Sequence, residues 1–178
     1  MSQALQYTIF RTRAGWMSAA ASELGLVRLT LPHPSAERAL QELGELPDRA
    51  VRADDCFTDL AVQLQSYFNR GRPSFRQALD LSVATTFQRA IWKAARRIPY
   101  GETRSYGELA VEIGRPGAAR AVGQAMSRNP VAIIIPCHRV VANSGNLGGF
   151  GGGPELKQYL LELEGNTSFN SYSEDGLD

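Results

Sequence analysis

The apolar residues of this 178-residue chain follow two different periods, and the change between them limits the fold. Residues 5–31 contain three short apolar runs, LQYTIFRT, WMSAAAS and LVRLTL, which are separated by Gly15 and Gly25. Runs of this kind between glycines predict three strands of an antiparallel meander. Later apolar residues recur at three- and four-residue spacing, which is typical of amphipathic helices. We therefore predict a mixed α/β (α+β) fold.

Two helices are expected to follow the strands. Pro34 precedes the short helical stretch SAERALQEL, and residues 54–70 carry one apolar helical face made of Phe57, Leu60, Ala61, Leu64, Tyr67 and Phe68. The breaker GRPS at 71–74 should end the second helix. ALDL at 78–81 is then expected to add a last strand to the sheet.

The chain becomes helical in character near residue 84. A first helix is expected to end at Pro99-Tyr100-Gly101, with its buried stripe formed by Phe87, Ile91, Ala94, Ala95 and Ile98. A second is expected over 105–113 with Ser105 as N-cap, and a third after the turn GRPG, with Pro116 in its first turn and its end near Arg128. Two helices joined by a glycine-containing turn have the outline of a helix-turn-helix, which also occurs in proteins that never bind DNA.

Positive charge is concentrated in this part of a chain whose net charge is only +1. Between residues 72 and 140, eleven Arg and Lys residues stand against four acidic ones, a balance of +7, and the remainder of the chain carries −6. Ten of the eleven are Arg, which suits bidentate contacts with phosphate. The asymmetry favours a module that binds a polyanion such as nucleic acid. An Arg-rich surface exposed only to solvent would give the same count.

The stretch GAARAVGQAM (117–126) consists almost entirely of small residues, with Arg120 as the long side chain in its middle. A smooth surface of this kind allows close helix packing inside a protein. It also suits a helix that enters the minor groove of DNA, where a long side chain can be wedged into the base stack. The residues alone leave both interpretations open.

Candidate chemistry is concentrated in Ile135-Pro136-Cys137-His138-Arg139-Val140-Val141. A neighbouring imidazole and guanidinium favour the thiolate form of a cysteine, and the thiolate is the nucleophile. The preceding run VAIII predicts a buried strand, and adjacent residues of an extended chain point to opposite faces. Cys137 and His138 would therefore need a turn or a bridging water to communicate. A buried, inert cysteine is the alternative.

Together with its surroundings, this motif resembles the O6-alkylguanine–DNA alkyltransferase family. The likeness rests on IPCHRVV, on RAVG (120–123) with Asn129-Pro130, on FQRAIWKAARRIPYGETRSYGELA (87–110), and on the closing helix through Glu164. It is strong over residues 80–165, whereas residues 1–79 match in outline. The resemblance implies a ribonuclease-H-like N-terminal α/β domain over 1–79. It also implies a helical DNA-binding and alkyl-acceptor domain with a winged helix-turn-helix over 80–165.

The activity that the resemblance implies is DNA repair by a methylated-DNA–protein-cysteine methyltransferase. An alkyl group, such as methyl, would pass from O6 of a flipped-out guanine in duplex DNA to Cys137. In this family pattern His138 is the base, acting through a water, Glu164 orients it, and Asn129 supports the link between recognition helix and active-site segment. Because the thioether product lies outside the reversible steps of thiol oxidation, each molecule would act once. No cofactor is expected.

The resemblance also assigns DNA contacts and a base pocket. Arg120 matches an arginine finger that replaces the flipped nucleotide in the stack, and Tyr106 matches a residue that pushes on the target phosphate. The other expected DNA contacts are Gly107, Arg115, Ala119 and Gly123. The base pocket is expected to be lined by Met126, Val140 and the Gly-rich segment 145–153, in particular by Leu147, Gly148, Phe150, Gly151 and Gly152.

Phe150-Gly151 departs from the family pattern, because many members carry Tyr-Ser at these positions. Two hydroxyl groups are thereby absent, one of which donates to the base or leaving group in relatives. We expect a looser pocket with altered tolerance for bulky alkyl groups or for O4-alkylthymine.

Some relatives hold a zinc ion in the N-terminal domain, but this chain offers only Cys56, His33 and two distal site residues as ligands. Four ligands are required, so no metal site is expected. Two cysteines are too few for a disulfide framework and indicate a reducing compartment. No run approaches the roughly 18 apolar residues of a membrane helix, and the first residues lack the pattern of a signal peptide.

We therefore expect a cytoplasmic protein, or a nuclear one in a eukaryote, which binds no membrane and acts on duplex DNA containing O6-alkylguanine. A monomer is expected, with cooperative DNA binding left open. The polar, acidic segment 166–178 is predicted to be a loose tail.

Two other functions fit parts of the sequence. A binding-only protein would flip the damaged base and mark it for other pathways without accepting the alkyl group. A cysteine hydrolase or protease would use Cys137 and His138 on small esters or peptides, but it leaves the basic helix pair unexplained.

Overall fold

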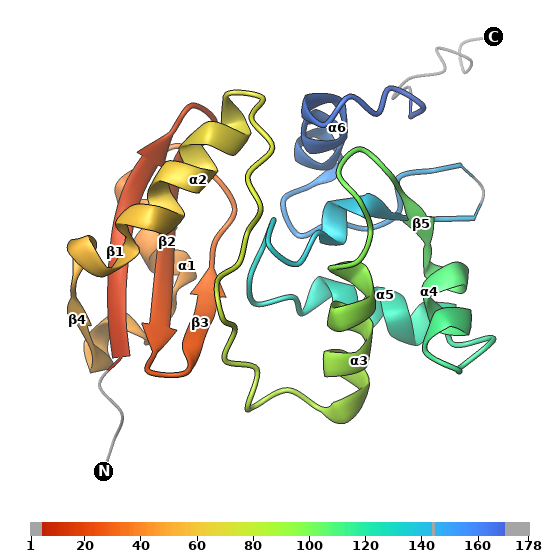
Figure 1. The fold of residues 1–178 in the computed structure, drawn as a ribbon, viewed down its shortest axis with the longest axis horizontal. Helices are drawn as coiled ribbons and strands as arrows, with labels where there is room; N and C mark the ends of the chain where they lie inside the picture. Colours follow the sequence, from red (N-terminus) through yellow and green to blue (C-terminus); the bar gives the residue numbers. More distant parts are fainter. Residues whose placement is uncertain (1–4, 144, 170–178) are drawn as a thin grey trace, which may run out of the picture. The chain divides into compact units, whose positions relative to one another are not determined.

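The computed structural model describes residues 5–143 and 145–169 (Figure 1). The chain divides into two compact units, of which the first comprises Met1–Arg89 and Asn129–Ile135. The second comprises Ala90–Arg128 and Pro136–Asp178. The domain boundaries expected from the sequence, at 79/80 and 165/166, stay predictions. The predicted tail lies outside the described residues from residue 170 on.

The first unit is built on a four-stranded sheet with the order β3-β2-β1-β4. Strands β1 (Leu5–Thr12), β2 (Gly15–Ser22) and β3 (Gly25–Leu29) pair antiparallel, which confirms the predicted meander. The short strand β4 (Ala50–Arg52) joins β1 in parallel. Gly15 and Gly25 both adopt φ +141°, and a Cβ on Gly15 would lie 2.6 Å from the carbonyl oxygen of His33. Glycine is therefore required at these strand ends.

The helices α1 (Ala36–Glu42) and α2 (Thr58–Phe68) cover this sheet, with α2 in front of it and α1 behind it in Figure 1. Ser35 caps α1 by accepting a hydrogen bond from the backbone N–H of Arg38. Two 3₁₀ turns, η1 (Pro47–Arg49) and η2 (Asp54–Phe57), flank β4. The successive residues 17–20 of β2 are all buried, which is expected of a strand covered on both faces.

Two strands predicted for this unit are wrong. Within 78–81, Leu79 forms an isolated bridge to Leu26 of β3 and no longer ladder. The run 131–135 is buried as predicted, but Val131 bridges Leu29 at one point only. Ile133 then turns the chain with φ +69°, a conformation that regular strands do not contain.

Four helices carry the second unit: the C-terminal part of α3 (Thr86–Ala95), α4 (Tyr106–Glu112), α5 (Ala119–Ser127) and α6 (Pro154–Leu163). The two-residue strands β5 (Arg104–Ser105) and β6 (Val140–Val141) pair in parallel. The indole Nε1 of Trp92 donates to the carbonyl oxygen of Ala125 over 3.0 Å and so ties α3 to α5. None of the described helices combines the length and hydrophobicity needed to cross a membrane.

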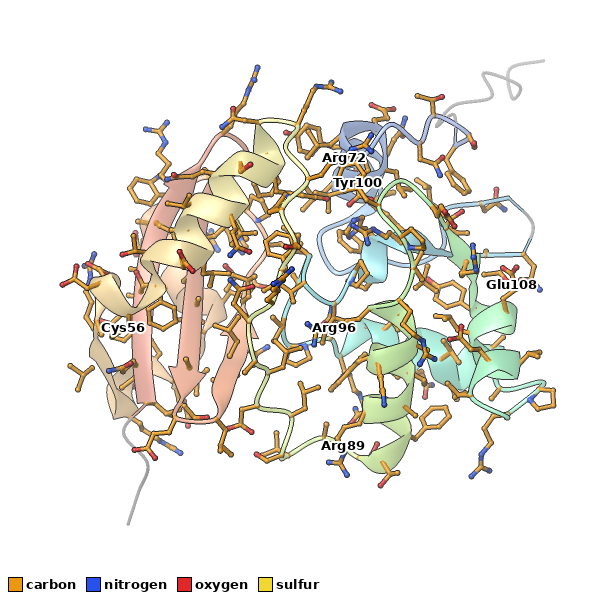
Figure 2. All side chains as sticks on the ribbon, in the orientation of Figure 1. Cys56, Arg72, Arg89, Arg96, Tyr100 and Glu108 are labelled. Atoms are coloured by element: carbon orange, nitrogen blue, oxygen red, sulfur yellow. The ribbon has the colours of Figure 1, made fainter. Side chains whose placement is uncertain are left out.

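The predicted helix pair is present, with two corrections at its borders. Ser105 caps α4 in a reciprocal capping box with Glu108, which Figure 2 labels. Pro116, however, lies in the turn before α5, because this helix begins only at Ala119. The preceding helix, α3, ends at Ala95 and does not continue to Pro99.

Candidate active site

A cavity of about 610 Å³ lies in the second unit beside Cys137, within the size range of small-molecule sites. It is formed by α4, α5, the 3₁₀ turn η3 (Cys137–Arg139) and the segment that follows β6. The residues that line it are Tyr106, Ala119, Arg120, Gly123, Gln124, Met126, Ser127, Cys137, Gly149, Phe150 and Gly151.

Most residues predicted for DNA contact or for the pocket meet at this cavity: Cys137, Arg120, Tyr106, Ala119, Gly123, Met126, Phe150 and Gly151. In the part of the chain that the structure describes, Val140, Leu147, Gly148 and Gly152 do not line this cavity, and their assignment to the base pocket stays a prediction. Val140 is fully buried beneath the site. Arg115 is exposed in the turn between α4 and α5, and Gly107 faces the side chain of Asn143.

The backbone at Cys137 is not extended. Cys137, His138 and Arg139 form the turn η3, so the alternation expected for a strand does not apply to them. Cys137 is half-buried and lines the cavity, whereas His138 is completely buried. The nucleophile candidate therefore faces the space where a base would fit, and the imidazole lies behind it in the protein.

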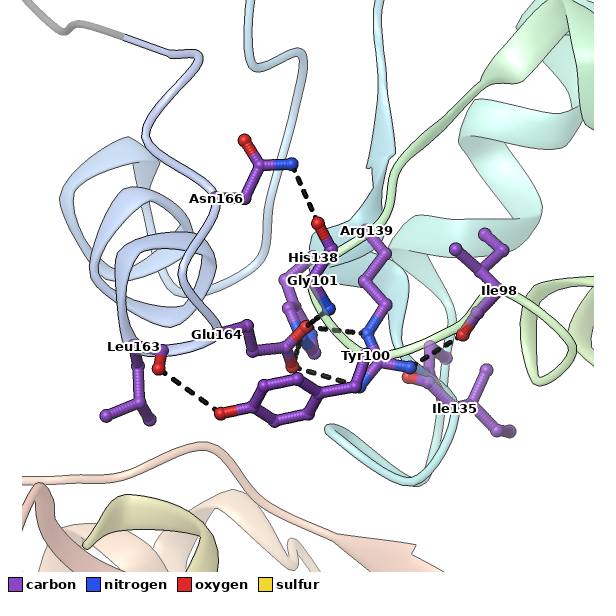
Figure 3. Close-up of polar contacts among 10 residues, drawn as sticks. Ile98, Tyr100, Gly101, Ile135, His138, Arg139, Leu163, Glu164 and Asn166 are labelled. Carbon is purple, nitrogen blue, oxygen red and sulfur yellow. Dashed lines mark hydrogen bonds and ion pairs between the residues drawn. The ribbon is translucent and has the colours of Figure 1, made fainter. Parts of the chain in front are cut away.

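His138 is held by the carboxylate at the end of α6. Its Nε2 lies 2.7 Å from Oε1 of Glu164, and neither side chain is exposed (Figure 3). The carboxylate fixes the proton of a neutral imidazole on Nε2, since a carboxylate accepts and the ring nitrogen must donate. Nδ1 is then the nitrogen that can take up a proton.

Arg139 completes the binding of Glu164, as Figure 3 shows. Its Nε and Nη2 donate to the two carboxylate oxygens over 2.8 and 3.0 Å, and the backbone N–H of Gly101 adds a bond of 3.0 Å. Its Nη1 donates to the carbonyl oxygen of Ile98 over 2.7 Å, and its guanidinium lies 5.8 Å from the ring centroid of Tyr100. Arg139 therefore belongs to the buried network, although the sequence analysis counted it with the polyanion-binding charges.

The pKa shifts in this network have opposite causes. Burial lowers the pKa of His138, and the hydrogen bond that its Nε2 donates to Glu164 offsets only part of that effect. Burial would raise the pKa of Glu164, but the hydrogen bonds and charges of His138 and Arg139 hold it well below the ordinary value. At neutral pH the site consequently contains a neutral imidazole beside an ionised carboxylate.

Asn129 organises the stretch of chain between α5 and η3. Its side-chain amide donates to the carbonyl oxygen of Ile135 over 2.8 Å, and its Oδ1 accepts from the N–H of Val131 over 2.9 Å. These bonds close the loop 129–135, and the role of Asn129 in linking the recognition helix to the active-site segment stays a prediction.

The segment after β6 packs against Tyr106. The Tyr106 hydroxyl donates to the carbonyl oxygen of Gly149 over 3.3 Å. Gly148 has φ +72°, and a Cβ there would lie 2.8 Å from the same hydroxyl, so only glycine fits. A Cβ on Gly123 of α5 would lie 3.8 Å from the other side of the tyrosine ring. Burial, and secondarily the charge of Cys137, raises the pKa of Tyr106, so its hydroxyl stays protonated.

Three residues of the site were missed by sequence reasoning: Gln124, Ser127 and Lys157. Gln124 and Ser127 were detectable, because they follow Arg120 and Gly123 at helical spacing. Lys157 is fully buried and bonded to the segment that carries Gly149. The sequence signal for Lys157 is its helical spacing to the apolar residues Leu160 and Leu161, which indicates the inward face of α6.

Exposed arginine side chains lie on α5 and in the chain on either side of it. Arg115, Arg120 and Arg128 are exposed, and within residues 5–143 and 145–169 none of them forms an ion pair. Arg97, in contrast, pairs with Glu112. In the same described residues, no three His, Cys, Asp or Glu side chains are grouped closely enough to hold a metal ion.

Comparison with known proteins agrees with this geometry. Residues 86–166 match the family model "6-O-methylguanine DNA methyltransferase, DNA binding domain". A methylated-DNA–protein-cysteine methyltransferase of Methanosarcina acetivorans is 41% identical over 164 residues, which cover 90% of this chain and 99% of the relative.

Solved structures are similar as well. The structure of Mycobacterium tuberculosis OGT in complex with DNA superposes with a TM-score of 0.77 at 41% identity and covers 90% of this chain and 93% of that one. The O6-methylguanine-DNA methyltransferase of Pyrococcus kodakaraensis gives a TM-score of 0.67 at 27% identity, with 90% and 99% covered. Sequence, fold and site therefore agree that this chain belongs to the methylated-DNA–protein-cysteine methyltransferase family.

Proposed function

We propose that this protein repairs O6-alkylguanine in duplex DNA by moving the alkyl group onto Cys137, once per molecule. The observation that carries the proposal is the position of Cys137. Cys137 lines a base-sized cavity together with Arg120 and Tyr106. The next residue in the chain, His138, forms a buried pair with Glu164. A cysteine with no reactive role would require neither this cavity nor the buried His138–Glu164 pair.

The buried pair prepares the thiol for attack. Cys137 gives its proton, through a water, to Nδ1 of His138, and Glu164 stabilises the imidazolium that forms. The thiolate then attacks the alkyl carbon. The new S–C bond forms as the C–O6 bond breaks, and the departing guanine keeps the electron pair and takes up the proton that His138 received, which leaves the imidazole neutral again. The thioether on Cys137 is stable, so the protein is consumed.

The alkyl carbon is out of reach while the guanine is stacked and paired, so the nucleotide must be flipped into the cavity. Arg120 is the only long cationic side chain of α5, and it is exposed at the edge of the cavity. We assign it as the finger that fills the gap in the base stack. Tyr106 lines the same cavity from α4 and is assigned to the phosphate of the flipped nucleotide.

We also infer the finer fold of the two parts. The meander β1–β3, with the parallel strand β4 and a helix on each face, supports a ribonuclease-H-like N-terminal domain over residues 1–79. The order α4, turn, α5 and the β5–β6 pair support a winged helix-turn-helix within residues 80–165, with α5 as the recognition helix.

The direct test is mass spectrometry after incubation with a duplex that contains one O6-methylguanine. We expect one added methyl group per protein molecule, on the peptide that contains Cys137. Cys137→Ser should remain unmodified. Cys56→Ser is the matched control, because Cys56 is the other cysteine and is exposed in the first unit (Figure 2), and this variant should react like the unchanged protein.

Each alternative function has its own outcome in this experiment. Unmodified protein bound tightly to the lesion identifies a binding-only protein. Many repaired duplexes per protein molecule, or turnover of small esters, identifies an enzyme that releases its product. Either result overturns the proposal.

A further inference from the structure

Lys157 is a fully buried lysine that the proposed reaction does not use. It lies in the first half of α6, and its side chain is 0% exposed. Its Nζ donates to the carbonyl oxygens of Val140 over 2.6 Å, of Leu147, and of Gly149 over 3.3 Å. One ammonium group therefore joins β6 to the segment whose Gly149 lines the cavity.

Among the described residues, the ammonium of Lys157 has no carboxylate partner. In the part of the chain that the structure describes, no Asp or Glu oxygen lies within ion-pair distance of its Nζ. Neutral carbonyl groups supply hydrogen bonds but no compensating charge, and a buried ammonium is costly unless an opposite charge lies near it. A negative group on this side of the cavity would satisfy it.

Two walls of the cavity face the same ammonium. The ring centroids of Tyr106 and Phe150 lie 5.8 and 6.0 Å from Nζ, within the range of cation–π attraction. Both rings line the cavity together with Cys137. Lys157 therefore lies directly behind the pocket wall.

The titratable groups that act on Lys157 are Tyr106 from α4 and Cys137 and His138 from η3. Burial lowers the pKa of Lys157 to about 8, and the negative charge of Cys137 acts in the opposite direction. The same ammonium adds to the effect of burial that lowers the pKa of His138. At pH 7 Lys157 is mainly charged, and the Cys137 thiolate, once it forms, is its negative neighbour.

We propose that Lys157 is the buried counter-charge of the Cys137 thiolate and that, through its carbonyl bonds, it also positions the segment 147–149 at the cavity. It is a positioning residue, since it keeps its proton throughout and touches no reacting atom. This inference rests on the proposed function, because it takes Cys137 as the alkyl acceptor.

Three substitutions separate the charge of Lys157 from its hydrogen bonds. Lys157→Gln keeps donors for the carbonyl groups but removes the charge, Lys157→Arg keeps the charge, and Lys157→Met removes both. Lys93→Met is the matched control, because Lys93 is exposed on α3. All variants are made in the Cys56→Ser background, so that Cys137 is the remaining thiol.

The readout is the rate of alkylation by iodoacetamide from pH 5 to 10, because only the thiolate reacts. For Lys157→Gln and Lys157→Met we expect the pH midpoint to rise by about one unit, which is a tenfold slower reaction at pH 7. Lys157→Arg should restore most of the rate, and Lys93→Met should change nothing. Superimposable pH profiles for Lys157→Gln and the unchanged protein overturn the inference.

A second measurement uses the unsubstituted protein, so that its result does not depend on whether the variants fold. The ammonium of Lys157 is titrated by ¹⁵N NMR before and after methylation of Cys137 by a lesion-containing duplex. Because the neutral thioether removes the negative neighbour, we expect the pKa of Lys157 to fall on methylation. An unchanged value overturns the inference. If Cys137 is never methylated, the proposed function fails instead, and the iodoacetamide profiles still judge the role of Lys157.

Discussion

Nε2 of His138 lies 2.7 Å from Oε1 of Glu164 in a part of the fold where neither side chain reaches solvent. Arg139 and the N–H of Gly101 bind the same carboxylate, so Glu164 is ionised before His138 takes up a proton. The imidazole that we propose as the base for Cys137 is therefore neutral at rest and oriented by a fixed negative charge. This arrangement suits a thiol that must lose its proton only when substrate is bound.

Glu164→Gln should slow alkyl transfer and destabilise the protein. The substitution removes the charge that stabilises the imidazolium and leaves Arg139, which is mostly buried, without its counter-ion. We expect the reaction with O6-benzylguanine to fall about 10²-fold, the lower end of the effect of a general base. The free energy of unfolding in urea should drop by about 3 kcal/mol, as for one partner of a buried ion pair.

Glu162→Gln is the control for this substitution. Glu162 lies on the same helix but is exposed and bonded only to Gln158 at its surface. It should change neither quantity by more than about 0.5 kcal/mol, the usual limit for surface sites. Equal effects of the two substitutions would show that the buried carboxylate has no special role.

The stability of the protein should decrease in acid in two steps. The pKa of His138 in the folded protein lies below the ordinary value of 6.5. As the pH falls through 6.5, the unfolded chain therefore binds a proton that the folded chain does not, and the free energy of unfolding decreases. The folded pKa of Glu164 is also lowered, and the same argument gives a second loss as the pH falls through 4.5. Unfolding in urea at several pH values between 7.5 and 2.5 follows the first step and the onset of the second, which continues below pH 4.5.

His138→Asn should remove the first of these steps. His33→Asn is its control, because His33 is the chain's other histidine and lies in the first unit beside Glu42. A stability that is constant from pH 7.5 to 5.5 in the unsubstituted protein would contradict the lowered pKa of His138.

Local signals in the sequence predicted the elements that local interactions create. Ser105 and Glu108 are three residues apart, and their capping box fixes the start of α4 where the pattern placed it. The meander β1–β3 follows from short apolar runs and from glycines at the turns. The motif around Cys137 also predicted the acceptor from its residue types, and the structure places Cys137 at the cavity.

The rest of the site depends on contacts between distant parts of the chain. The run 131–135 looked like a strand, but its single bridge to Leu29 and the turn at Ile133 prevent one. Arg139 looked like a surface charge, since its partner Glu164 is 25 residues further along the chain. Lys157 bonds to carbonyl groups, which no side-chain pattern reveals. Such features arise from tertiary packing and need coordinates.

Arg120→Ala should impair the repair of duplex DNA far more than the reaction with a free base. Only the duplex leaves a gap in the base stack, and unstacking costs a few kcal/mol per step. We expect the second-order rate on a duplex with O6-methylguanine to fall about 10²-fold, and the rate with free O6-benzylguanine to stay within about twofold. Arg128→Ala, which removes an exposed arginine that does not line the cavity, is the control. Equal losses on both substrates would exclude the finger role.

Gly151→Ser should accelerate the reaction. Gly151 lines the cavity, and a Cβ there meets no atom within 4 Å, so a serine is accommodated without strain. Its hydroxyl would restore a donor that this chain lacks beside the departing guanine. One hydrogen bond made mainly as charge develops contributes about 0.5–1.5 kcal/mol, which corresponds to a roughly 2- to 10-fold faster reaction with O6-benzylguanine.

Gly151→Ala separates the hydroxyl from the added carbon and should leave the rate unchanged. Gly148→Ala should slow it, because its Cβ would collide with the Tyr106 hydroxyl. If the alanine and serine variants at position 151 react equally fast, the missing hydroxyl does not limit this protein.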